Sequence, residues 1–235
     1  MKYSPEKERR DALFDGPSKY DVFNTYLLHD AEYAGELEMP VLKGVQATPN
    51  KLVPFSKAMV KSFTERDCWI CFYEHDINFL RLWRHPEKYL AKMLEFNGII
   101  SPDFSMYRNM PAIMQYWSCF MGRAIAHRYQ ADGGMVIPNV RLSDRRSHRF
   151  CLDGLPRNST IAIGTHGCIK HAEDRHYTRI AVEEAVMRLN PVRIIVYGSA
   201  PDDVFVAAIE RGVEVVEFKS LFSQTHEKRD GNGNG

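Results

Sequence analysis

Short apolar segments alternate with stretches of helical periodicity along most of this chain. From Pro40 onward the apolar segments recur at intervals of about 25 to 35 residues, which is typical of parallel strands joined by crossover helices. The pattern predicts seven strands, at residues 41–46, 68–74, 98–101, 135–139, 160–165, 192–197 and 213–218.

The segments between these strands carry helix start and stop signals. One helix is predicted to be N-capped by Asn109, to have Pro111 in its first turn and to end before Gly133. A second is predicted over about residues 86–96, ending at Asn97-Gly98. A third helix is predicted over residues 174–189 and is closed by Asn190-Pro191. A fourth is predicted to begin at a capping box, Ser199-Ala-Pro-Asp202, and to end at Gly212.

Repeated strand–helix units of this kind predict an α/β fold with parallel strands and crossover helices. Such units either close into a barrel or form an open sheet. No signal of a reversal in strand order is present, and polar residues follow most of the strands. These two features favour a TIM-barrel-like or partial-barrel arrangement, and the alternative is an open doubly wound sheet of the Rossmann or flavodoxin type.

Three regions are expected along the chain. Residues 1–39 lack a clean period and contain the breaker Gly16-Pro17, so we expect an extension with one short helix that packs over the domain. Its packing residues would be its aromatic side chains: Phe14, Tyr20, Phe23 and Tyr26. Residues 40–223 form a single α/β domain, and residues 224–235, which end in alternating glycine and asparagine, are expected to be disordered.

Composition narrows the functional classes. Lysine and arginine total 31 and aspartate and glutamate total 30, so no global positive field favours coating of nucleic acid. Five cysteines, an odd number, and a charged N-terminus without an apolar secretory segment indicate a reducing cytoplasm. No apolar run approaches the roughly 20 residues that span a bilayer, so we expect no membrane partner.

Polar residues follow the apolar strands, where parallel strands place their carboxyl ends on one rim. Carboxylates and an imidazole on one rim suit acid–base chemistry, so we predict Asp76, Asp103 and His166 as catalytic candidates. Side chains and a helix N-terminus that suit a polar ligand are predicted at Ser101, Asn139, Arg141, Thr165, Gly198 and Ser199. Among the aromatics Phe104, Tyr107 and Tyr116, one could stack on a base.

Structural roles compete with each of these assignments. Asp76 and Asp103 are residue types that cap helices and turns, His166 can hydrogen-bond within its turn, and Gly198-Ser199 can be an ordinary helix cap. Cys68 and Cys71 have the spacing of half a zinc site, and His166, Cys168 and His171 could supply its remaining ligands. Residues three apart in a strand point to opposite faces, which disfavours this zinc site. A hard or borderline cation held by Asp76, Asp103 and a histidine stays open but lacks a diagnostic spacing, so no metal ligand is assigned and the cofactor stays unknown.

Several short motifs resemble one uncharacterised family. They are Ser101-Pro-Asp-Phe-Ser105 followed by Met110-Pro111, Val136-Ile-Pro-Asn-Val140, Thr165-His-Gly167, and Asn190-Pro191 before Ile194-Ile-Val-Tyr-Gly198. Together they look like a family catalogued only as a domain of unknown function, found in phages, plasmids and prokaryotic genomes. The likeness runs from about Pro40 to Phe218. It implies a phage or mobile-element protein in a host cytoplasm and supplies no activity.

Three functions remain open on these residues. The first is binding of an anionic, nucleotide-like small molecule at the rim, with or without its hydrolysis or transfer. The second is a non-enzymatic protein that sequesters a host defence signal or inhibits a host protein. The third, less favoured, is a nucleic-acid replication or processing factor that uses the arginines between Arg141 and Arg149. The residues do not decide between turnover and binding, and they do not indicate an oligomeric state.

Overall fold

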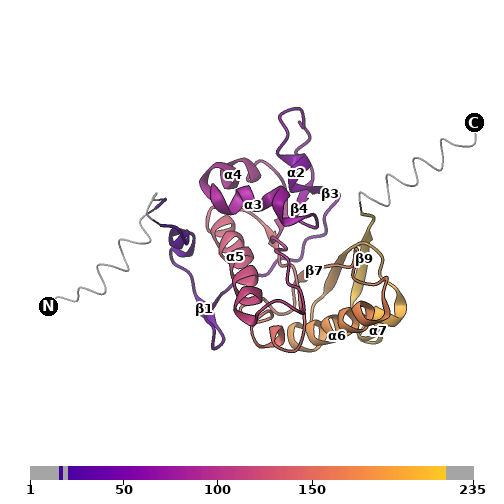
Figure 1. Cartoon of the computed structure of the whole chain (residues 1–235). Helices are drawn as coiled ribbons and strands as arrows, with labels where there is room; N and C mark the ends of the chain where they lie inside the picture. Colours follow the sequence, from indigo (N-terminus) through magenta and orange to yellow (C-terminus); the bar gives the residue numbers. More distant parts are fainter. Residues whose placement is uncertain (1–15, 18–20, 221–235) are drawn as a thin grey trace, which may run out of the picture.

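The structure, a computed structural model, describes residues 16–17 and 21–220 (Figure 1). Seven parallel strands are present in this part of the chain: β3 (Leu52–Pro54), β4 (Trp69–Cys71), β5 (Gly98–Ile100), β6 (Val136–Ile137), β7 (Thr160–Gly164), β8 (Arg193–Tyr197) and β9 (Glu214–Phe218). The α-helices are α2 (Phe55–Ala58), α3 (Asp76–Arg84), α4 (Pro86–Met93), α5 (Ala112–Ala131), α6 (Ala172–Leu189) and α7 (Asp202–Glu210). The remaining elements are the 3-10 helices η1 (Thr25–Leu28) and η2 (Ser147–Arg149) and a hairpin of β1 (Tyr33–Ala34) with β2 (Met39–Pro40).

The strands form two parallel sheets in which strand order follows the sequence. One sheet has the order β3-β4-β5-β6 and the other β7-β8-β9. A single parallel bridge between Asn139 and Ala162 joins them, and the amide of Val140 donates to the carbonyl of Ala162 at 2.8 Å. The order has no reversal of the kind that a doubly wound sheet contains.

Both faces of the strands are buried, which explains their continuous apolar character. Ile70, Ile99 and Ile194 point into the core that the helices share with the sheets. Their neighbours along the strands point to the opposite face and form a second cluster: Trp69, Cys71, Ile100, Ile137, Ala162, Ile195 and Tyr197. In Figure 1, α3, α4 and α5 lie beside the four-stranded sheet, and α6 and α7 pack together along the three-stranded one.

The α/β class and six of the seven predicted strands are confirmed. The first predicted strand, at residues 41–46, is wrong, because that segment is irregular and β3 begins only at Leu52. Residues 41–46 run beside the start of β7 but form few of the backbone hydrogen bonds that define a strand pair. The amide of Thr160 donates to the carbonyl of Val45, whereas the amide of Val45 turns to the Ser159 hydroxyl.

The sequence pattern favoured a barrel-like arrangement over an open sheet, and a closed barrel is wrong. The sheets are open, with β3 and β9 as edge strands that do not pair with each other in the described part of the chain. Closure requires the last strand to meet the first in register. Here the inner face is instead filled by side chains, with Leu52 of β3 and Phe218 of β9 packed against the same apolar cluster.

The four predicted helices are present as α4, α5, α6 and α7, whereas α2 and α3 are additional, and the expected caps of α5 and α7 are wrong. The N-cap of α5 is Pro111, two residues after the expected Asn109. The expected capping box at Ser199 is absent, because Pro201 is the N-cap of α7 and makes no side-chain cap bond. In both cases a proline fixes an extended backbone directly before the first turn and so displaces the polar cap.

The expected short helix in the N-terminal extension is η1, in which Tyr26 is buried. Phe23 meets Trp117 of α5 edge-on, with ring centroids 6.0 Å apart. Phe14, Tyr20 and the expected disordered tail at residues 224–235 lie outside the described residues. Within the described part, no helix combines the length and the apolar character that a bilayer crossing requires.

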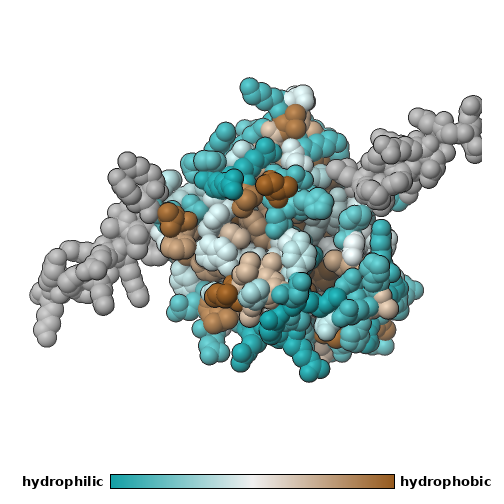
Figure 2. Space-filling model, in the orientation of Figure 1, coloured by the Kyte–Doolittle hydropathy of each residue, from teal (hydrophilic) through white to brown (hydrophobic). Residues whose placement is uncertain are grey.

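The surface carries separate apolar spots. On the face in Figure 2 the hydrophobic side chains lie apart from one another, and the region over α6 and α7 is mainly hydrophilic. Exposed apolar residues include Ile77, Tyr107 and Ile113. Scattered apolar side chains of this kind are ordinary on a protein surface.

Candidate functional site

A pocket of about 880 Å³ lies beyond the carboxyl ends of β4 to β7. Its walls come from the segments that follow these strands and from the first turns of α6: residues 73–75 and 78, 103 and 105–109, 140–143, 163–164 and 166–168, and 174, 177, 178 and 181. The volume lies within the range of sites that bind small molecules and cofactors. The pocket occupies the end of the sheet at which ligands bind in βαβ proteins.

A buried polar network forms one side of this pocket. Asn139 connects it: its side-chain amide donates to Asp103 at 2.8 Å, its amide oxygen accepts from the Tyr73 hydroxyl at 2.8 Å, and its backbone N–H donates to Ser101 Oγ at 2.8 Å. Arg141 Nη1 lies 3.3 Å from the other oxygen of Asp103. The strand-end residues 101, 103, 139 and 141 are thus brought together, although they come from two different strands.

Burial and charge pairing set the electrostatics of this network. Burial raises the pKa of Asp103, and the Arg141 guanidinium and the Asn139 amide oppose that rise. The neighbouring carboxylate of Asp103 raises the pKa of Arg141. Burial also raises the pKa of Tyr73 well above its usual value, so its hydroxyl stays a hydrogen-bond donor. The network therefore contains one ion pair, between Asp103 and Arg141, and its carboxylate is buried.

Arg141 retains free hydrogen-bonding capacity on the pocket side. Its Nη1 donates to Asp103 and lies 3.9 Å from Cys168 Sγ. Among the described residues, its Nε and Nη2 have no hydrogen-bond partner, and its side chain is 29% exposed at the pocket wall. A guanidinium held from behind by a carboxylate presents its remaining donors in a fixed direction.

Asp76 has a different environment. It is the first residue of α3, and its carboxylate accepts from the Ser105 amide at 3.1 and 3.2 Å and from the Ser105 hydroxyl at 2.9 Å. These bonds tie the loop between β5 and α5 to the start of α3. Asp76 does not line the pocket, whereas Ser105 does.

The other predicted residues divide into two groups. His166 is exposed and lines the pocket. Thr165, Gly198 and Ser199 lie together outside the pocket lining, with Thr165 Oγ1 donating to the Ser199 carbonyl at 2.8 Å. The predicted anion cradle here is partly filled by the protein itself, because the amide of Ala200 donates to the Glu217 carboxylate at 2.6 Å.

Arg108 and Asp174 line the pocket but are not among the predicted site residues, because they pair over a long distance in the sequence. Arg108 donates to Asp174 at 2.6 Å, pairs with Glu173 at 3.2 Å and stacks on the Tyr177 ring. This joins the β5–α5 loop to the start of α6 across the pocket. Acidic residues in a first helical turn normally indicate only a favourable helix dipole, so the sequence contained no signal that they pair with Arg108.

The aromatic candidates also separate. Phe104 is buried against Phe79, and the Tyr116 hydroxyl donates to the Leu37 carbonyl. Tyr107 is 59% exposed and lines the pocket. Of these three, only Tyr107 offers a ring to a ligand.

The cysteine pair considered for zinc lies on two faces of one strand region. Cys68 belongs to the core beneath the helices and Cys71 to the opposite apolar cluster. Across the described residues, no three side chains among His, Cys, Asp and Glu are grouped so that they could hold a metal ion.

These features define an α/β protein with open parallel sheets and a ligand-sized pocket beyond the strand ends. The chain belongs to the family described as "Domain of unknown function (DUF4417)", which matches residues 31–219. It is 27% identical over 183 residues to the "Gene 1 protein" of Mycobacterium phage L5, covering 77% of this chain and 79% of that one. Identity to the "Gene 1 protein" of Mycobacterium phage D29 is 26% over 183 residues, covering 77% and 67%. No solved structure matches the chain.

The resemblance inferred from the short motifs, to an uncharacterised family with phage members, is therefore confirmed. The printed names of the relatives state no ligand and no activity.

Proposed function

We propose that the pocket binds an anionic, nucleotide-like small molecule, in the cytoplasm of the host cell. The observation that carries this proposal is the Arg141 guanidinium, which is anchored by Asp103 and has two nitrogens without partners in the described part of the chain. Phosphates and carboxylates are the groups that such planar donors bind best.

Size and stacking support the nucleotide-like part of the proposal. The pocket, at about 880 Å³, has room for a base, a sugar and phosphates. The exposed Tyr107 ring lies on its wall, and a base stacked on a tyrosine gains roughly 1–3 kcal/mol.

Binding without turnover is the second candidate, and the carboxylates favour it. Asp76 is occupied by Ser105, and Asp103 is paired with Arg141 and Asn139. Neither is poised as a free general base. Among the three catalytic candidates, His166 alone lies exposed in the pocket, so a hydrolytic or transfer reaction would depend on it.

The arginine-rich loop is less suited to nucleic acid. Arg141 pairs with Asp103, and Arg146 pairs with Asp144 at 2.6 Å. His148 lies 3.9 Å from Glu184. Because internal carboxylates offset the charges of Arg141 and Arg146, the loop presents a weaker positive field than its sequence suggests.

A charge-neutral double variant tests the proposal. Asp103→Asn with Arg141→Gln removes both charges, whereas Arg141→Gln alone would leave a buried carboxylate unpaired. We would measure the melting temperature with and without nucleoside mono-, di- and triphosphates and cyclic nucleotides. The expected result is a rise in Tm for at least one compound and an affinity about 10- to 100-fold weaker in the double variant, the value of a charged hydrogen bond.

Arg145→Gln is the matched control, since Arg145 is exposed in the same loop and lies outside the pocket. It should bind like the wild type. Equal binding by the double variant, or no response of the wild type to the whole panel, would overturn the proposal. Recovery of the bound compound after denaturation, unchanged or altered, distinguishes sequestration from turnover.

A further inference from the structure

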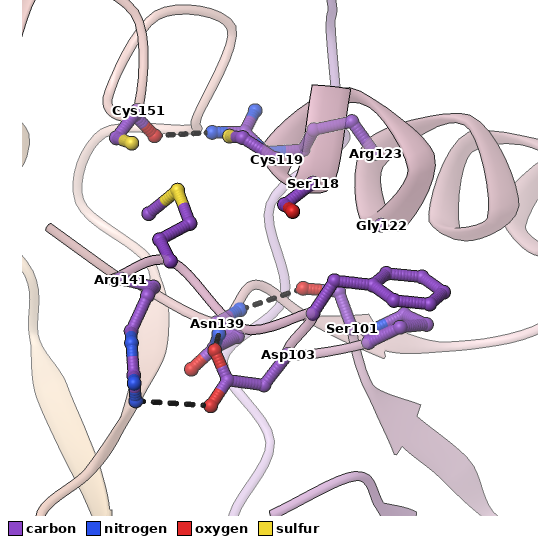
Figure 3. A pocket seen from close by; sticks show the side chains of 12 residues that line it. Ser101, Asp103, Ser118, Cys119, Gly122, Arg123, Asn139, Arg141 and Cys151 are labelled. Carbon is purple, nitrogen blue, oxygen red and sulfur yellow. Dashed lines mark hydrogen bonds and ion pairs between the residues drawn. The ribbon is translucent and has the colours of Figure 1, made fainter. Parts of the chain in front are cut away.

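A second, smaller cavity of about 20 Å³ lies behind the Asp103–Arg141 pair. Figure 3 shows Cys119, Arg123 and Cys151 on one side of it and Ser101, Asp103, Asn139 and Arg141 on the other. A space of this size holds one water-sized molecule.

Arg123 contributes a buried guanidinium to the lining of this cavity. It is 3% exposed and lies four residues after Cys119 on α5, so the two share a helix face. Its guanidinium donates to the carbonyl of Cys151 at 2.6 Å and to that of Asp153 at 3.0 Å. No carboxylate within the described residues forms an ion pair with it, so its positive field acts on the two neighbouring sulfurs.

The two thiols differ in acidity because of this arrangement. The neighbouring Cys151 thiol and the Arg123 guanidinium lower the pKa of Cys119. Burial raises the pKa of Cys151. Cys119 is also the more exposed of the two, half-buried where Cys151 is buried, so it is the sulfur that an oxidant reaches first.

We propose that Cys119 and Cys151 form a peroxide-reactive thiol pair, in which the cavity admits hydrogen peroxide to Cys119 and Cys151 then closes a disulfide. The inference rests on two cysteines and a buried guanidinium that line one small cavity. Both cysteines also belong to the same small apolar cluster, with Met39, Met106 and Phe150.

The reaction balances in two steps. The Cys119 thiolate attacks one peroxide oxygen, the O–O bond breaks, and the departing hydroxide takes the proton that Cys119 released and becomes water, leaving a sulfenic acid. The Cys151 sulfur then attacks the sulfenic sulfur, the S–O bond breaks, and a second water leaves with the Cys151 proton. Two thiols thereby reduce one peroxide to two waters and become one disulfide.

Oxidation of the full-length chain tests this. The reduced protein is treated with equimolar hydrogen peroxide, its free thiols are alkylated, and its peptides are mapped by mass spectrometry. The expected product is a linked Cys119–Cys151 peptide pair, lighter by two hydrogens and restored by dithiothreitol. Cys151→Ser should stop at a sulfenic acid on Cys119, and Cys119→Ser should leave Cys151 reduced.

Cys168→Ser is the matched control, because Cys168 lies half-buried in the larger pocket. This variant should form the Cys119–Cys151 disulfide at the wild-type rate. Oxidation that falls on Cys168 while Cys119 and Cys151 stay reduced would refute the inference. The readout needs no ligand, so it stands or fails separately from the proposed function.

Discussion

Asp76 and Asp103 are both strand-end carboxylates in the sequence, yet their surroundings differ. Asp76 opens α3, where a negative charge is stabilised by the helix dipole, and it accepts three hydrogen bonds from Ser105. Asp103 is buried and shares its two oxygens between Asn139 and Arg141. The same residue type therefore fixes a loop in one place and anchors a cation in the other.

We predict that Asp76→Ala lowers the free energy of unfolding by about 1–2 kcal/mol, because a helix-start acceptor and its bonds to Ser105 are lost. Asp76→Asn keeps an acceptor oxygen and should lose less than half as much. Urea unfolding of both variants measures this, with ligand binding in the pocket retained. A large loss of binding in a stable Asp76→Asn protein would instead return Asp76 to the catalytic candidates.

The segment between β6 and β7 illustrates how one element is stabilised by its own charges. Arg146 binds the Asp144 carboxylate through its side chain and its backbone amide and also reaches the carbonyls of Arg108 and Met110. The side-chain bond from Arg146 is the main cause that lowers the pKa of Asp144 from its ordinary value of 3.8 to about 2. This carboxylate thus fastens the loop to the β5–α5 connection.

The lowered pKa of Asp144 predicts a pH dependence of stability. Since the folded pKa lies below the unfolded one, ionised Asp144 stabilises the fold above about pH 4 and loses that contribution as the pH falls toward 2. Asp144→Asn should therefore be less stable than the wild type at pH 7, with most of the difference lost by pH 2. Denaturant unfolding across this range tests it.

Glu36→Gln, at an exposed position in the β1–β2 turn, is the control for that series and should follow the wild type at each pH. A stability difference for Asp144→Asn that is the same at pH 2 and pH 7 would contradict the assignment to the Asp144 charge.

At the scale of the whole molecule, the two sheets share one buried apolar face. One backbone bridge connects them, but the inner apolar cluster draws on both sheets, from Trp69 of β4 to Ile195 of β8. Tyr73 and Tyr197 stack across the same face, with ring centroids 5.0 Å apart. Loss of either sheet would expose the inner face of the other.

We therefore predict that the slowest amides of β5 and β8 open with the same free energy in native-state hydrogen exchange. Ile195→Ala should lower both values together by about 2–5 kcal/mol, as expected for a fully buried isoleucine. Ile209→Ala, at a side chain 53% exposed on α7, should change neither by more than about 0.5 kcal/mol. Two separate opening energies would show that the sheets unfold independently.

The sequence by itself determined the α/β class, six of the seven strands, the positions of the main helices and the family. These features follow from local patterns: short continuous apolar runs such as Ile99-Ile100 or Ile194-Ile195, and helical spacing closed by glycine, asparagine or proline. It also placed Asp103, Asn139 and Arg141 at neighbouring strand ends, because parallel strands align those ends on one side.

Only the tertiary structure decided which partners these residues take. The open sheet depends on whether β3 and β9 meet, and nothing local to either strand records that. Arg108 pairs with Asp174, and Cys119 and Cys151 line one small cavity, although many residues separate the members of each pair. No spacing along the chain indicates either arrangement. Sequence periodicity specifies which face of an element is buried, whereas long-range packing specifies what that face, and each charge upon it, will touch.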